Sequence, residues 1–133
     1  MREILFRGKR TINGDWVYGD FVHGNERKSL RDSIFVYDSE TQSFNDYEIN
    51  PSTLGQYTGL TDKNGNRIFE GDVAKVLQGK DKDIAYVGFE NGAFMLYPKT
   101  GNIYERTLWE YWYNDWDVEV IGNITDNPEL LEK

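Results

Sequence analysis

The sequence predicts an all-β fold with one or two short helical turns, and three observations point to this class. Aromatic residues make up 15% of the 133 residues, and such side chains suit the half-buried surface of a pleated sheet. They occur in short runs that alternate with glycine, asparagine and aspartate, as strands alternate with turns. The chain has no cysteine, so a packed core has to stabilise the fold without disulfides.

The order of the predicted elements suggests two parts. We expect N-terminal β hairpins, in a subdomain over residues 1–51, to pack on a C-terminal SH3-like barrel over residues 70–133 that ends in a turn. Closing a barrel removes the exposed edges of a sheet. Residues 52–69 read as a turn-rich connector. The boundary falls at Asn50-Pro51-Ser52, because a residue before proline is pushed towards extended backbone.

Two strand pairs are predicted in the N-terminal part. Their strands are residues 3–7, 16–22, 33–37 and 44–49. Ile12-Asn13-Gly14-Asp15 joins the first pair, and Asn-Gly is favoured in a tight hairpin turn because both central residues then need positive φ. Residues 38–42 supply the turn-forming side chains of the second pair. The polar residues 26–32 are expected to be mostly loop.

The C-terminal part contains the clearest hairpin. The predicted strands of the C-terminal part are residues 72–77, 84–89, 93–97 and 118–124. Glu90-Asn91-Gly92 lies between the second and third of these strands and carries the Asn-Gly signal of a tight turn. A β hairpin is therefore predicted over residues 84–97.

Residues 104–113 are ambiguous between a helix and a strand. Leu108 and Trp112 are four residues apart, as one face of a helix requires, but the run is aromatic enough for a strand. We favour a short helix or an irregular turn. Near the end of the chain, Asn127 can cap a helical turn that begins at Pro128.

Several motifs resemble those of the YopX-like proteins of bacteriophages and prophages. They are residues 1–7 (MREILFR), 55–65 (GQYTGLTDKNG), 68–73 (IFEGDV), 119–124 (EVIGNI) and 127–131 (NPELL). The resemblance covers nearly the whole chain, and it is weakest over residues 23–50 and 98–117. It implies a mostly β fold and a phage or prophage origin. It implies no established activity and no catalytic or ligand-binding residue.

The absence of cysteine excludes disulfides and thiolate metal sites and is typical of a reducing compartment. The first ten residues do not form a signal peptide, since their apolar run is short and broken by charges. No stretch approaches the roughly 20 apolar residues of a membrane span. We therefore expect a cytoplasmic location in a bacterial host cell.

No residue pattern indicates catalysis, a cofactor or a metal. His23 is the single histidine, and we interpret it as a surface loop residue. Asp62 could begin a calcium-binding loop, but Gly65 is fourth where that motif has glycine sixth, so a reverse turn is the better interpretation. Asp115, Asp117 and Glu119 alternate, which places them on one face of a strand, and a solvated face explains them without acid–base chemistry.

The densest feature is the aromatic segment 109–116. Its candidate partner-binding residues are Trp109, Tyr111, Trp112, Tyr113 and Trp116. Tryptophan and tyrosine are enriched at binding hot spots because they bury a large area and keep a polar group. A small core also needs large side chains. We expect about half of these rings to be buried, which leaves one or two for a partner.

The charge of the chain favours protein binding over nucleic-acid binding. The net charge is −8, and residues 105–133 hold eight acidic side chains against two basic ones. We expect a non-enzymatic protein-binding module, whose partner is another protein or a second copy of the chain. The alternatives are an acidic decoy of a host nucleic-acid-binding protein and a small-barrel nucleic-acid-binding protein, the latter opposed by the charge. We expect no membrane contact, no cofactor and no small-molecule substrate.

Overall fold

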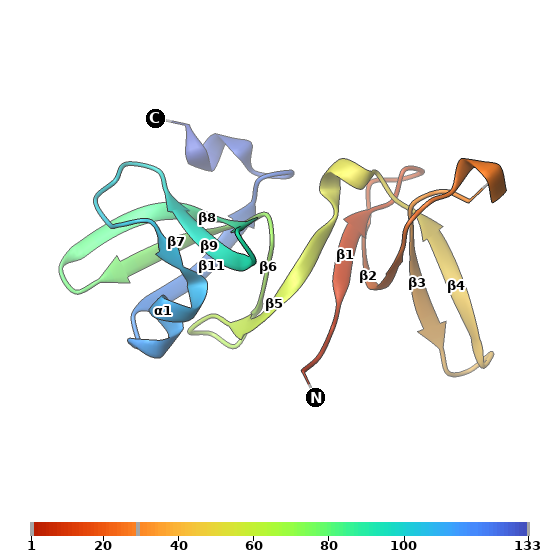
Figure 1. The fold of residues 1–133 in the computed structure, drawn as a ribbon, viewed down its shortest axis with the longest axis horizontal. Helices are drawn as coiled ribbons and strands as arrows, with labels where there is room; N and C mark the ends of the chain where they lie inside the picture. Colours follow the sequence, from red (N-terminus) through yellow and green to blue (C-terminus); the bar gives the residue numbers. More distant parts are fainter. Residues whose placement is uncertain (1, 29, 133) are drawn as a thin grey trace. The chain divides into compact units, whose positions relative to one another are not determined.

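The computed structural model describes residues 2–28 and 30–132 and is mostly β, with two antiparallel sheets. The all-β prediction is confirmed. The chain divides into two compact units, residues 1–57 and 58–133, and Figure 1 shows their elements in chain order. Strand β5 (Gly55–Thr61) crosses the division. The interval 52–69, predicted as a turn-rich connector, contains a 3-10 helix, β5 and β6.

The first unit is an antiparallel meander in which β4, β3, β2 and β1 lie in that order, with the start of β5 on the far side of β1. The elements are β1 (Phe6–Lys9), β2 (Trp16–Val22), β3 (Ser33–Asp38), β4 (Ser43–Glu48), η1 (Glu26–Lys28) and η2 (Pro51–Thr53). Both predicted strand pairs are present, but the first strand spans Phe6–Lys9 and not the predicted residues 3–7. At its end, β4 also meets β1 through a bridge between Ile49 and Arg10.

The connection between β1 and β2 differs from the predicted turn. Gly14 has a positive φ of 74°, but Asn13 does not, so the prediction of positive φ at both residues is wrong. The Asn13 side chain instead accepts a hydrogen bond from the Asp15 amide at 3.0 Å, and the Gly14 amide donates to the Arg10 carbonyl at 2.9 Å. This longer loop uses the asparagine as a side-chain acceptor.

Close approach of the strands shapes the core of the first unit. Ile34 and Ile49 are its fully buried aliphatic residues. A Cβ on Gly19 would lie 2.3 Å from the Phe35 carbonyl oxygen, and one on Gly8 would lie 2.6 Å from Ile49 Cδ1. Glycine is therefore required at Gly19, where the backbone of β3 occupies the space, and at Gly8 a larger residue would displace the buried Ile49 side chain.

The second unit is built on a five-stranded sheet in the order β10-β9-β8-β7-β11. The elements are β6 (Arg67–Phe69), β7 (Asp72–Gln78), β8 (Asp81–Glu90), β9 (Ala93–Pro98), β10 (Arg106–Thr107), α1 (Leu108–Tyr113), β11 (Asp117–Asn123) and η3 (Pro128–Leu131). The predicted hairpin is confirmed as β8–β9. Its turn residues Asn91 and Gly92 both have positive φ, 51° and 82°, as a two-residue hairpin requires.

The predicted SH3-like barrel is not confirmed, because the five-stranded sheet does not close. Its edge strands, β10 and β11, pair only with β9 and β7 respectively. Strand β10 is two residues long and leads directly into α1. The side chains that α1 contributes to the core cover one face of the sheet, so this face is buried without closure.

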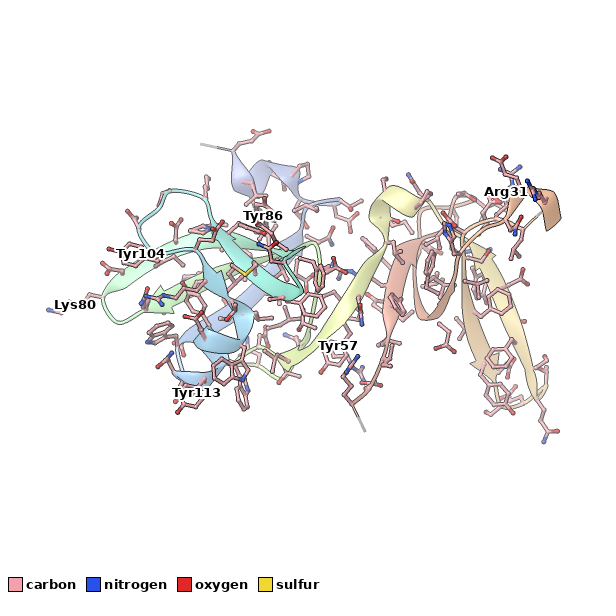
Figure 2. All side chains as sticks on the ribbon, viewed as in Figure 1. Arg31, Tyr57, Lys80, Tyr86, Tyr104 and Tyr113 are labelled. Atoms are coloured by element: carbon pink, nitrogen blue, oxygen red, sulfur yellow. The ribbon has the colours of Figure 1, made fainter. Side chains whose placement is uncertain are left out.

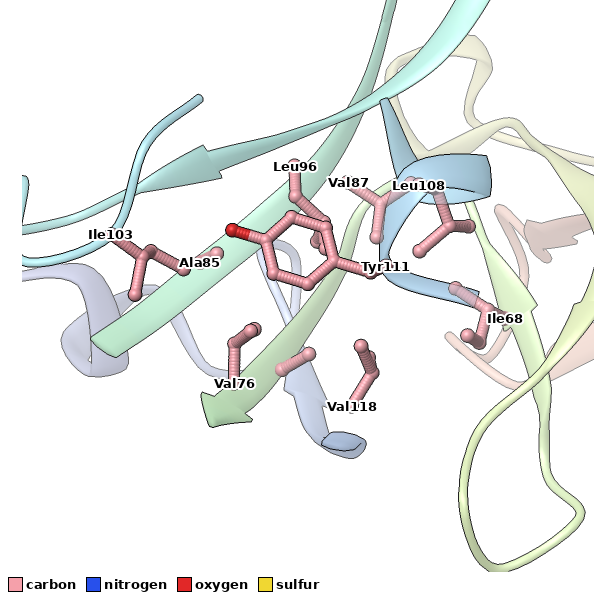
Figure 3. Close-up of a cluster of buried hydrophobic side chains, with 10 residues drawn as sticks. Ile68, Val76, Ala85, Val87, Leu96, Ile103, Leu108, Tyr111 and Val118 are labelled. Atoms are coloured by element: carbon pink, nitrogen blue, oxygen red, sulfur yellow. The ribbon is translucent and has the colours of Figure 1, made fainter. Parts of the chain in front are cut away.

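The core of the second unit gathers around one tyrosine. Tyr111 is fully buried, and Figure 3 shows its ring in the middle of the cluster. The surrounding buried residues are Ile68, Ala74, Val76, Ala85, Val87, Leu96, Ile103, Leu108 and Val118. The Tyr111 hydroxyl donates a hydrogen bond to the Tyr104 carbonyl at 3.1 Å, so its polar end is satisfied inside the core.

A buried aspartate organises the turn that precedes β6. Asp62 Oδ1 accepts hydrogen bonds from the Asn64 and Asn66 amides, both at 2.9 Å. Its Oδ2 accepts one from the Val120 amide of β11 at 2.9 Å. Burial alone would raise the pKa of Asp62, but these amide donors outweigh it and hold the pKa below the usual 3.8.

Asp83, near the start of β8, holds the loop that follows β9 in a similar way. Its carboxylate accepts hydrogen bonds from the Thr100 hydroxyl at 2.8 Å and from the Ile84 and Asn102 amides at 2.8 and 3.1 Å. Burial opposes ionisation here too, but the donors prevail and the pKa of Asp83 is lowered.

Within the described part of the chain, none of the helices has the length and apolar character that crossing a membrane requires.

Candidate protein-binding surface

Helix α1 carries most of the predicted site, and its start is fixed by a reciprocal cap. The Thr107 side chain accepts a hydrogen bond from the Glu110 amide at 3.2 Å, and its hydroxyl donates to Glu110 Oε1 at 3.2 Å. A threonine followed three residues later by glutamate is a helix-start signature. This signal was present in the sequence and would have resolved the ambiguity over residues 104–113 in favour of a helix.

The buried face of α1 differs from the predicted one. Leu108 and Tyr111, three residues apart, point into the core. Trp112, which was predicted to share a face with Leu108, is 57% exposed. The buried face of this six-residue helix is therefore formed by two residues three positions apart, Leu108 and Tyr111.

Three aromatic side chains remain on the outer side of the helix. Trp109 is 55% exposed, Trp112 57% and Tyr113 67%, and Figure 2 shows Tyr113 projecting from α1. The rings of Trp109 and Tyr113 stack, with centroids 4.9 Å apart and an interplanar angle of 21°. Fully burying a large apolar side chain stabilises a protein by roughly 1.5–3 kcal/mol, and these rings forgo much of that. We call Trp109, Trp112 and Tyr113 the α1 aromatic surface.

The other two predicted partner-binding residues belong to the core side of the unit. Tyr111 is fully buried. Trp116 is half-buried and packs edge-on against Tyr111, with centroids 5.0 Å apart. The guanidinium of Arg106 lies 5.8 Å from the Trp116 ring centre. We therefore assign Tyr111 and Trp116 to folding, and of the five rings one is buried, one half-buried and three exposed.

The charges near α1 are mostly negative. Glu110 pairs with Arg106 at 2.9 Å, and this hydrogen bond is the main cause of the lowered pKa of Glu110. Asp115 and Asp117 are exposed. Asp115 has a positive φ of 56° and precedes β11, so it does not share the strand alternation predicted for Asp115, Asp117 and Glu119.

The remaining candidate residues have structural roles or lie on the surface. The His23 side chain is 84% exposed, and its Nδ1 lies 3.2 Å from Asp32 Oδ1. Both oxygens of Asp62 hold the turn and β11 together, which agrees with the reverse-turn interpretation. Among residues 2–28 and 30–132, no three histidine, aspartate or glutamate side chains come together as metal ligands would.

Comparison with known proteins supports the fold and the family. A search of curated proteins finds no match. The crystal structure of protein EF1440 from Enterococcus faecalis aligns with a TM-score of 0.60, over 99% of this chain and 100% of that one, at 22% identity. At this identity the likeness shows a shared fold. The family model described as YopX protein matches residues 5–132, so the chain belongs to the YopX family.

Proposed function

We propose that the chain is a non-enzymatic protein-binding module and that the α1 aromatic surface contacts its partner. The single observation that carries this proposal is the exposure of Trp109, Trp112 and Tyr113 side by side on one short helix. Contiguous exposed aromatic side chains mark interaction sites. The partner is another protein or a second copy of the chain.

Two of the groups with shifted pKa values, Asp62 and Asp83, are tied into the fold. Asp62 and Asp83 are ionised, but amide and hydroxyl donors occupy their oxygens. A general base needs an oxygen within hydrogen-bond reach of a substrate proton. These two carboxylates therefore serve the fold, and the α1 aromatic surface carries aromatic side chains in place of a nucleophile.

Site-specific cross-linking tests the proposal directly. A photoreactive phenylalanine analogue at position 113 places the probe in the α1 aromatic surface. We expect it to capture one protein species from a bacterial host carrying the gene, or a second copy of the chain. Trp112→Ala is expected to reduce the yield of that species about tenfold or more, as truncation of a hot-spot tryptophan does.

Phe89→Ala is the matched control, because Phe89 is also an aromatic residue of the second unit and is 54% exposed. It should leave the cross-link unchanged. Equal cross-linking by the parent chain, Trp112→Ala and Phe89→Ala would contradict the proposal. Light scattering across a concentration series then separates self-association from capture of a different protein.

A second candidate function is that of an acidic decoy, which occupies the nucleic-acid-binding site of a host protein. Residues 58–133 hold fourteen acidic side chains and eight basic ones, and Asp115 and Asp117 are exposed beside α1. Competition between the chain and DNA for the captured partner, weaker at high salt, is the expected behaviour of a decoy. Capture of the partner that DNA does not affect would exclude the decoy function.

The phage origin and cytoplasmic location stay predictions.

A further inference from the structure

The outer side of strand β4, away from β3, is open at Phe44 and Asp46, and Thr11 covers it at Glu48. Strand β4 is the terminal strand of its sheet, and all six of its residues pair regularly with β3. Natural edge strands are commonly protected by proline, by charged side chains (lysine above all) or by a bulge. Strand β4, Ser-Phe-Asn-Asp-Tyr-Glu, contains no proline or lysine, its charges are both acidic, and its pairing shows no register shift.

Two backbone hydrogen bonds show which groups of β4 face outward. The Ile49 amide donates to Asp32 beside β3, whereas the Glu48 carbonyl accepts from Thr11 on the opposite side. Because these directions alternate along an antiparallel strand, the amide and carbonyl groups of Phe44 and Asp46 also point away from β3. Among the described residues, these groups have no backbone partner.

The same alternate residues place their side chains on one face of the sheet. Phe44 lies opposite Tyr37, and Asp46 lies opposite Phe35. Phe44 contacts Tyr37 edge-on at 5.3 Å between ring centres, and both rings are more than half exposed, at 56% and 55%. Asp46 is exposed, and no ion pair with another described residue neutralises it. Along the open edge, the apolar Phe44 side chain is therefore followed two residues later by the negatively charged Asp46 side chain.

We propose that this edge binds an extended segment of a partner protein by strand addition, and that the segment is cationic. Main-chain hydrogen bonds to Phe44 and Asp46 supply affinity, and alternate side chains supply specificity. The segment places an apolar residue beside Phe44 and, two positions away, a lysine or arginine beside Asp46. A second copy of β4 would set acidic side chains near each other, which disfavours self-pairing.

The test uses a peptide of sequence Thr-Lys-Thr-Val-Thr-Lys-Thr with blocked ends. Its valine can face Phe44 while one lysine faces Asp46 when the peptide adds as an antiparallel strand, in which the amides of the valine and lysines point toward β4. In a titration followed by nuclear magnetic resonance, we expect the Phe44 and Asp46 amide signals to shift most. Replacing both lysines by glutamate should weaken binding about tenfold or more, and methylating the backbone nitrogens of the valine and both lysines should abolish it, since one edge of the peptide then lacks donors.

Matched variants of the protein complete the experiment. Asp46→Asn should weaken binding about two- to five-fold, the usual size of one cross-strand charge pair. Asp117→Asn changes the net charge equally on another edge strand and should have no effect. Equal affinity for the lysine and glutamate peptides, unchanged binding after methylation, shifts confined to other strands, or no binding at millimolar peptide would each overturn the proposal. Dimers that protect β4 amides without peptide would also overturn it.

Discussion

At the scale of single residues, two buried carboxylates hold segments of the second unit together. Asp62 joins the turn before β6 to β11, and Asp83 ties the start of β8 to the loop after β9. Each uses charge-assisted hydrogen bonds, which are stronger than neutral ones. Their side chains connect segments far apart in the chain, so both positions have a large predicted effect on stability.

Asp62→Asn is expected to lower the free energy of unfolding by about 2–3 kcal/mol, because the amide presents a donor to amide groups that need an acceptor. Guanidinium unfolding measures this. Asp81→Asn removes an exposed carboxylate and should change stability by less than about 0.5 kcal/mol. Equal effects of the two substitutions would show that the Asp62 contacts are not stabilising.

The same carboxylate predicts a pH dependence. Its pKa in the folded protein is below the usual 3.8, so its contribution is present above that value and is lost as the pH falls through the folded-state pKa. The stability difference between the parent chain and Asp62→Asn should therefore be largest near neutral pH and shrink below about pH 3.8. Urea unfolding at several pH values measures it, and a difference that grows on acidification would contradict the assignment.

Tyr97 should titrate unusually late. Its hydroxyl donates a 2.7 Å hydrogen bond to Glu90, and this bond, with burial and the nearby charge, raises its pKa to about 12. In Glu90→Gln the pKa of Tyr97 should shift towards the ordinary value of 10.0. The nuclear magnetic resonance signal of the ring carbon that bears the hydroxyl reports this ionisation. A curve that is identical in the parent chain and in Glu90→Gln would exclude this cause.

The sequence could identify the aromatic segment but could not assign each ring a role. Tyr111 and Trp112 are adjacent and similar in size, and their burial depends on which side of α1 meets the core. The Thr107–Glu110 cap was readable in the sequence, and it would have fixed the helix start. The assignment of Tyr111 to the core came from contacts with β7, β8 and β9, which no local pattern contains.

At the scale of elements, close strand contact in the first unit makes a sharp prediction. Gly19→Ala places a methyl group where the Phe35 carbonyl oxygen lies, so β2 and β3 must move apart. We expect a loss of about 1–3 kcal/mol or more in unfolding free energy. Gly14→Ala, whose new Cβ meets open space but whose φ is positive, should cost about 1 kcal/mol. A smaller loss at Gly19 than at Gly14 would contradict the packing described.

Local patterns predicted the elements better than they predicted sheet closure. The β8–β9 hairpin followed from Asn91-Gly92, because a two-residue turn dictates both backbone conformations. The SH3-like barrel did not follow, because closure depends on whether the two edge strands meet. Strand β10 is too short for that, and α1 follows it directly.

At the scale of the whole molecule, charge and exposed aromatic residues are distributed differently in the two units. Residues 1–57 hold nine acidic and seven basic side chains, and residues 58–133 hold fourteen and eight. The first unit offers an open strand edge, and the second offers the α1 aromatic surface. A partner with cationic segments suits both features, because it complements the excess of acidic side chains in each unit.

The most direct test of the central claim is a paired measurement on the double variant Trp109→Ser, Trp112→Ser, which retains Leu108 and Tyr111 in the core. We predict that guanidinium unfolding gives a free energy within about 1 kcal/mol of the parent chain. Cross-linking from position 113 should meanwhile fall at least about tenfold. Loss of several kcal/mol of stability, or cross-linking that persists at the parent level, would show that these rings serve the fold and not a partner.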